Sequence, residues 1–405
     1  VGAQTGDALT VGELNTAVGQ NALSADIKGN RSVAIGNSAL RYQNFTNATD
    51  TYNTAVGFSA GLSVTTGTNN TLIGGLSGDA ITTGGSNTSV GAYAMTTLTT
   101  GNHNVAVGTS ALDVTTTGSQ NVAIGVSALG ANTTATKNTA VGYQAGYSNT
   151  TGVLITAIGQ AALQDNTTGN GSTAVGASAL GDNTTGTDNT AVGSYYSSQA
   201  PLRFNTTGNF NTALGGGALS FNTTASSNTA VGYQAAYSNT TGTSVDAFGT
   251  GSLYTNTTGN NNAGFAAGSL VSNTTGSTNS AFGRDALRNN TTASSNTAVG
   301  YQAGYFNTTG QYNNAFGRSA LYYNTTGGNN VAIGMYSLLN NTTASNNTAV
   351  GYGAALANTT GGNNVAVGEG SLHSNTTASN NTAVGWRAGY ANTTGTLTAT
   401  GRTAL

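Results

Sequence analysis

The chain has no cysteine and only one proline in 405 residues, and charged residues make up only 5% of it. Without cysteine there is neither a disulfide framework nor a thiolate metal site. Ten Lys and Arg balance twelve Asp and Glu, so the basic footprint that nucleic-acid binding requires is missing. Disordered chains usually combine low hydrophobicity with high net charge or many prolines, whereas this chain has a net charge of -2 and one proline. These absences favour an ordered chain without a nucleic-acid partner.

Long apolar runs and clusters of reactive side chains are also missing. No stretch approaches the 18 apolar residues of a membrane-spanning helix, so we expect no membrane insertion by this segment. The two histidines, His103 and His373, lie far apart in the sequence, and the acidic residues are scattered. The glycines never follow the strand-to-long-helix pattern of a phosphate-binding loop. We therefore predict no enzymatic activity, no catalytic residue, no cofactor and no metal site.

What the sequence does contain is a repeat with a period of 17 residues in about 24 units. Each unit reads Asn-Thr-Ala-Val-Gly-x-x-Ala-Leu-x-x-Asn-Thr-Thr-Gly-x-x, and its positions are numbered here from the first Asn. Insertions interrupt the period near residues 41–50 and 194–204. Short tandem units of this kind stack upon one another. The repeat therefore predicts one continuous solenoid over residues 1–405, and the start at Val1 without a signal peptide suggests a part of something longer.

A unit of this length is too short for a pair of helices, and it carries helix-breaking glycines. In residues 33–35 (Val-Ala-Ile) and 122–124 (Val-Ala-Ile) larger side chains alternate with Ala, as in a strand. We expect a second short strand at positions 8 and 9, with Val at position 4 and Leu at position 9 in the core. The predicted fold is an all-β, parallel β-solenoid (a β-roll or β-helix) with turns stacked roughly 4.8 Å apart.

The predicted core of one Val and one Leu per unit is thin, which favours further burial against other chains. The small residues at positions 3, 5 and 8 would suit close approach between chains. We therefore expect a parallel homotrimer in the form of a rod.

Two columns of Asn recur, at positions 1 and 12 of the units. Their amides could hydrogen-bond from one turn to the next, as in stacked β-structures. Position 12 holds Val64, Ile81, Leu98 and Thr115 in early units, and Asn takes over at Asn132. A column that accepts both apolar side chains and Asn is turned inward or against a neighbouring chain.

The Asn-Thr-Thr segments also fit the N-glycosylation motif. An inward Asn could not carry a glycan, so the structural interpretation is favoured, and glycosylation stays an alternative. Columns of threonine suggest ice binding as a further alternative. However, adjacent Thr at positions 13 and 14 would point in opposite directions in a strand and could not form one flat face. The glycosylation candidates are Asn132, Asn149, Asn166, Asn183, Asn205 and Asn222.

Aromatic residues gather at positions 6 and 10. Where Leu at position 9 becomes Gly, at Gly146, Gly304 and Gly389, Tyr or Trp stands at position 6 and Tyr at position 10. We interpret this as packing compensation, in which neighbouring bulk replaces the missing Leu. The alternative is an exposed aromatic stripe that stacks on sugar rings or on another fibre.

Residues 32–36 (Ser-Val-Ala-Ile-Gly) and 121–125 (Asn-Val-Ala-Ile-Gly) resemble the head motif of trimeric autotransporter adhesins. Residues 347–361 are similar to repeats of bacterial and phage proteins called tail fibre domain-containing. The adhesin resemblance implies a trimeric, left-handed parallel β-roll.

We therefore predict a structural extracellular fibre, a surface adhesin, a filament or a phage tail fibre shaft, located at the cell surface or on a virion. Its partners would be further copies of itself, as a homotrimer or filament, and host or surface glycans or receptors. Repeated weak contacts along a fibre multiply their affinities. The two insertions are expected to protrude, and their candidate contact residues are Tyr42, Phe45, Tyr195, Tyr196, Pro201 and Arg203.

Overall fold

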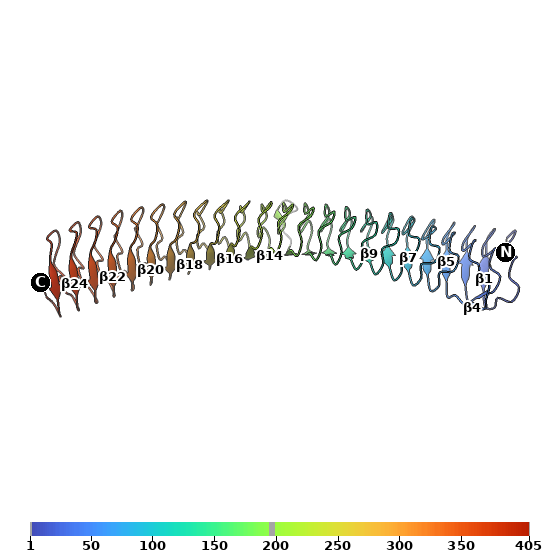
Figure 1. Cartoon of the computed structure of the whole chain (residues 1–405), viewed down its shortest axis with the longest axis horizontal. Helices are drawn as coiled ribbons and strands as arrows, with labels where there is room; N and C mark the ends of the chain where they lie inside the picture. Colours follow the sequence, from blue (N-terminus) through green and yellow to red (C-terminus); the bar gives the residue numbers. More distant parts are fainter. Residues whose placement is uncertain (1, 194–198, 405) are drawn as a thin grey trace. The chain divides into compact units, whose positions relative to one another are not determined.

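The computed structural model describes residues 2–193 and 199–404. It confirms an all-β, parallel β-solenoid of about 22 turns with a period of about 17 residues and, in the described part, no α-helix. Figure 1 shows the turns following one another in sequence order, with a short strand in each. The chain forms two compact units, which meet in the sequence between Gly208 and Asn209. Each unit is described by itself.

The first unit contains eleven strands of three residues that pair in parallel with the strand of the next turn. The register advances by one sequence repeat, so that Thr139 faces Thr156 and Ala140 faces Ala157. A separate two-residue pair joins β2 (Gly29–Asn30), which precedes the first insertion, to β4 (Thr49–Asp50) at its end. The strands are β1 (Thr16–Val18), β3 (Val33–Ile35), β5 (Thr54–Val56), β6 (Thr71–Ile73), β7 (Thr88–Val90), β8 (Val105–Val107), β9 (Val122–Ile124), β10 (Thr139–Val141), β11 (Thr156–Ile158), β12 (Thr173–Val175) and β13 (Thr190–Val192).

The second unit repeats the arrangement with twelve strands, again parallel and in register. They are β14 (Thr212–Leu214), β15 (Thr229–Val231), β16 (Asp246–Phe248), β17 (Ala263–Phe265), β18 (Ser280–Phe282), β19 (Thr297–Val299), β20 (Asn314–Phe316), β21 (Val331–Ile333), β22 (Thr348–Val350), β23 (Val365–Val367), β24 (Thr382–Val384) and β25 (Thr398–Thr400).

Apart from the β2–β4 pair, each described turn has one strand, so the prediction of a second strand at positions 8 and 9 is wrong. Those residues lie in turns that bend through the left-handed backbone region. Leu129, at position 9, has φ 49° and is fully buried. A non-glycine residue rarely adopts this conformation, and here the burial of the side chain offsets its cost.

The face of the strand that points inward differs from the prediction. Ala123, at position 3 of its unit, is fully buried, whereas Ile124, at position 4, is 39% exposed. Successive side chains of a strand point to opposite faces, so burying Ala at position 3 directs positions 2 and 4 outward. The core therefore consists of Ala at positions 3 and 8, Leu at position 9 and the two Asn columns, and the prediction that Val at position 4 lies in the core is wrong.

The small residues serve close approach within one chain. Ala123 and Ala128, at positions 3 and 8, lie in the interior of their own turn. Gly125, at position 5, has φ +134°, and a Cβ there would come within 2.4 Å of the carbonyl oxygen of Gly142 in the next turn. The expectation that these positions mediate approach between chains is therefore wrong, because successive turns of the same solenoid occupy the space.

Both Asn columns point inward, which confirms the interpretation of position 12. The Asn307 side chain donates to Asn290 Oδ1 (2.9 Å) and to the Gly310 carbonyl (2.9 Å), and it accepts from Asn324 Nδ2 (2.8 Å). At position 1, Asn347 Oδ1 accepts the backbone N–H of Asn364 in the next turn (2.9 Å). These bonds satisfy amides that would otherwise be costly to bury.

Candidate functional surfaces

The candidate contact residues of the first insertion have different surroundings. Tyr42 is 48% exposed, but Phe45 is buried. The backbone N–H of Phe45 and the side chain of Gln43 both donate to the buried carboxylate of Asp26. The insertion is thus fixed to the turn before it, and of the two aromatic candidates only Tyr42 offers its side chain to a partner.

In the second insertion, Tyr195 and Tyr196 lie outside the described residues. Pro201 is buried, so it is not a contact residue in this conformation. Arg203 forms an ion pair with Asp182 in the preceding turn, and burial lowers the pKa of its guanidinium, with Asp165 acting in the opposite direction. Arg203 therefore stabilises the stacking of its own turns.

The glycosylation candidates are all inside the solenoid. Each amide lies in the position 12 column and is inaccessible to solvent, and each donates hydrogen bonds to a neighbouring turn or turn carbonyl. This burial argues against a glycan on any of them in the folded chain. They are Asn132, Asn149, Asn166, Asn183, Asn205 and Asn222.

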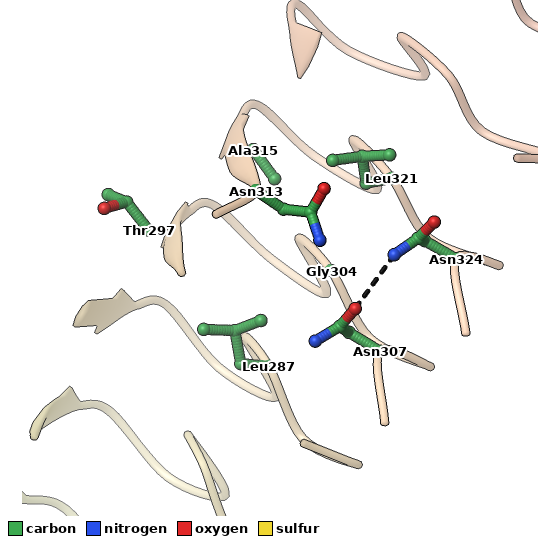
Figure 2. A pocket seen from close by; sticks show the side chains of 8 residues that line it. All are labelled: Leu287, Thr297, Gly304, Asn307, Asn313, Ala315, Leu321 and Asn324. Carbon is green, nitrogen blue, oxygen red and sulfur yellow. Dashed lines mark hydrogen bonds between the residues drawn. The ribbon is translucent and has the colours of Figure 1, made fainter. Parts of the chain in front are cut away.

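Packing compensation does not account for the aromatic residues near the position 9 glycines. Tyr143 and Tyr147, which flank Gly146, are 52% and 39% exposed, so their rings lie outside the core. At Gly304 the missing Leu leaves a cavity of about 10 Å³ beside Leu287 and Leu321 (Figure 2). That space is about the size of one water molecule, so this cavity has no room for a larger ligand.

The second unit instead carries an exposed aromatic cluster, formed by Tyr305, Phe306, Tyr322 and Tyr323. Phe306 and Tyr323 stack with ring centroids 5.6 Å apart and planes 6° apart, and Tyr305 and Tyr322 stack at 5.2 Å. Next to the cluster lies an open groove of about 580 Å³. Its lining residues are Phe306, Tyr323, Thr325, Asn340, Thr342 and Thr359.

A second exposed feature, the outward strand face, runs along each unit. It consists of the side chains at positions 2 and 4, with Thr or Val most often at position 2 and Val, Ile, Leu or Phe at position 4. Phe248, Phe265 and Phe282 stack along it at 4.7 Å. Position 4 side chains that are 36–44% exposed are Val18, Ile35, Ile73, Ile124, Ile158, Val192, Leu214, Phe282, Val299, Phe316, Ile333 and Val384.

The sequence contained a signal for this face that the prediction overlooked. Position 3 is nearly always Ala, whereas position 2 varies from Thr to Val, Asp and Asn, and position 4 varies from Val to Phe. In a tandem repeat, the position that stays small is the one with neighbours on every side. Size variation at positions 2 and 4 therefore indicates that they face outward.

Among residues 2–193 and 199–404, no three His, Cys, Asp or Glu side chains lie close enough to hold a metal ion. The ring of His373 stacks on Tyr390 at 4.7 Å, and burial, together with Arg387, lowers the pKa of this imidazole. In the same described ranges, no helix has the length and apolar character needed to cross a membrane.

The comparisons with known proteins add no family assignment. No protein-family model matches the chain, and no curated protein matches it.

Proposed function

We propose that the protein is a structural extracellular fibre that associates laterally with copies of itself, as part of a surface adhesin or filament or of a phage tail fibre shaft. The observation that carries the proposal is the outward strand face. In each unit it forms a strip of partly exposed apolar side chains in register. Contiguous apolar surface of this kind usually marks an interaction site.

A second copy of the same chain is the partner that fits this strip best. Each copy presents a ladder with the same spacing, so the ridges of one could lie against those of another over many turns. Ile124 and Ile158 expose 39% and 40% of their surface on this face, and no charged side chain stands among the position 2 and position 4 residues of β1, β3 and β5–β13. In a trimer each strip would be withdrawn from water, which is the favourable term in such association. The expected assembly is a stiff fibre on which the surfaces outside the outward strand face recur from turn to turn.

The test is the mass of the particle in solution. Wild-type protein should elute as a trimer in size-exclusion chromatography with light scattering, and Ile124→Lys should shift it toward the monomer with unchanged circular dichroism. Val126→Lys is the matched control, because Val126 is 45% exposed but lies outside the strand. A monomeric wild-type protein at micromolar concentration, or equal effects of the two substitutions, would overturn lateral association through this face.

Ice binding is the second candidate, because the strand face places Thr and Val side by side on one flat surface. Thr139, Thr156 and Thr173 occupy position 2 in successive turns, each with Val or Ile two residues later on the same face. Because these threonines stand at position 2, the opposite directions expected for Thr at positions 13 and 14 do not argue against ice binding. A regular array of hydroxyl and methyl groups can order water, and a thermal-hysteresis assay on the monomer tests it. Absence of hysteresis at millimolar concentration would remove this candidate.

A further inference from the structure

The groove beside the aromatic cluster begins at one face of Tyr323. The other face of this ring stacks on Phe306, and the two planes are nearly parallel. Both side chains occupy position 11 of successive units, so the stack follows the direction in which the turns succeed one another. The next unit has Asn340 at this position. Because Asn is shorter than an aromatic side chain, the stack ends at Tyr323 and leaves one ring face over the groove.

The lining of the groove also contains a column of threonines at position 13. The hydroxyl groups of Thr325 and Thr342 donate to the carbonyl oxygens of Thr342 and Thr359, each at 3.1 Å, and that of Thr359 donates to Thr376 at 3.0 Å. Each hydroxyl hydrogen is thus used in a bond within the chain, and each hydroxyl oxygen keeps lone pairs that can accept a hydrogen bond from a ligand. This column therefore offers a row of acceptors to a ligand that carries hydroxyl groups.

Asn340 supplies both a donor and an acceptor at the end of the groove. Within the described part of the chain its side-chain amide has no hydrogen-bond partner, and only its backbone N–H is bonded, to Leu356. None of the six lining residues is charged. The groove therefore combines the ring of Tyr323, a residue that is 46% exposed, an amide and a row of hydroxyl acceptors, without an ionic group.

We propose that this groove binds a neutral pyranose unit of an oligosaccharide, stacked on the free face of Tyr323 above Asn340. A pyranose has one flank of C–H groups, which packs on an aromatic face, and a rim of hydroxyl groups, which donate to Thr oxygens and exchange hydrogen bonds with an amide. Charged ligands find no counter-ion here. The inference rests on the proposed function, since it names the class of surface ligand that a multivalent fibre would contact at this edge.

The groove volume fits this size of ligand. About 580 Å³ is within the 300–1,000 Å³ range of small-ligand sites and has room for more than one sugar unit along the Thr column. One such contact would be weak, but a polysaccharide is a repeated ligand and a fibre is a repeated receptor. Linked weak contacts raise the overall avidity without a tight single site.

The experiment titrates the full-length protein with three neutral probes, cellohexaose, chitohexaose and mannohexaose, by saturation-transfer difference NMR and calorimetry. We expect saturable binding of at least one probe, weakened about tenfold or more by Tyr323→Ala and retained by Tyr323→Phe. Asn340→Tyr should abolish binding, because a third ring would stack on Tyr323 in the place of the sugar. Tyr312→Ala is the matched control, since Tyr312 is 57% exposed and does not line the groove.

The outcomes separate this inference from the proposed fibre. Absence of saturable binding to all three probes overturns the saccharide site, and so does binding that Tyr323→Ala and Asn340→Tyr leave unchanged. Light scattering on the same samples reports the oligomeric state. If Tyr323→Ala dissociates the oligomer and no probe binds, the cluster is an interface between copies and the saccharide site is refuted, whereas lateral association stands.

Discussion

Removing one amide from the inner Asn column should loosen the solenoid locally, and Asn307→Ala is the sharpest case. Asn307 is only 1% exposed and connects Asn290 on one side with Asn324 on the other (Figure 2 shows the bond to Asn324). Its third bond, to the Gly310 carbonyl, is backed by Asn296, which donates to the same oxygen at 2.9 Å. Truncation therefore leaves two unpaired groups, Asn290 Oδ1 and one N–H of Asn324.

The size of the effect follows from those two groups. A buried polar group that loses its partner costs roughly 1–3 kcal/mol, so the two groups together should lower the local free energy of opening in Asn307→Ala by about 2–6 kcal/mol. Since 1.4 kcal/mol is a factor of ten in an equilibrium constant, amide hydrogen exchange should accelerate roughly 30-fold to 20,000-fold. In a repeat protein, where stability is approximately a sum over neighbouring turns, the acceleration should be centred on residues 290–325.

The assay is hydrogen exchange followed by mass spectrometry, with peptides from residues 139–190 as the internal reference. Thr309→Ala is the matched control, because Thr309 belongs to the same turn but is exposed. Asn307→Thr should fall between the two. The chain itself joins Thr115 to Asn132 in this column, where the Thr hydroxyl accepts from the Asn amide at 3.1 Å. If Asn307→Ala exchanges no faster than Thr309→Ala, the column does not stabilise the turns and the reasoning is refuted.

Two further predictions concern the core and the response to pH. Leu321→Ala should cost about 2–5 kcal/mol, because Leu321 is 1% exposed and already borders a cavity, whereas Leu356→Ala should change the local exchange rate less, because Leu356 is partly exposed. Burial, reinforced by Asp113, raises the pKa of Asp79, one of whose carboxyl oxygens is buried without a partner among the described residues. The folded state therefore holds this proton more tightly than the unfolded state, so the resulting stability is present in acid and is lost as the pH rises through the folded pKa. Asp79→Asn should raise the melting temperature at neutral pH and reduce its change between acid and neutral pH, and a pH profile parallel to wild type would contradict this assignment.

The interior columns could be predicted to different degrees. The replacement of Val64, Ile81 and Leu98 by Asn from Asn132 onward indicated an inward column, because only an interior position accepts either an apolar side chain or a fully paired amide. Which strand residues are buried was harder to predict, because the alternation of side chains along a strand defines two faces but does not say which face is inside. At β9, both Ala123 and the pair Val122 and Ile124 were suitable for burial.

The candidate surfaces were the least predictable part. Phe45 and Pro201 were expected to protrude, yet both residues are buried. The groove at Tyr323 depends on where a ring stack stops, at Asn340. The sequence shows that aromatic residues share a column, but the stacking and the groove that the position 13 threonines line arise only when the chain has closed each turn.

By itself, the sequence determined the solenoid, its period and the inward direction of the position 12 column. A repeat of 17 residues that is rich in glycine and almost free of charge has few other ways to satisfy its backbone than by pairing each turn with the next. The tertiary structure decided which strand face is buried and therefore which surfaces a partner could meet. The physical reason is space: Leu at position 9 fills the interior next to position 3, so Ala is the regular residue there and the larger Val, Ile and Phe side chains of position 4 remain outside. Leu72 is buried at position 3 where Gly61 and Gly78 stand at position 9.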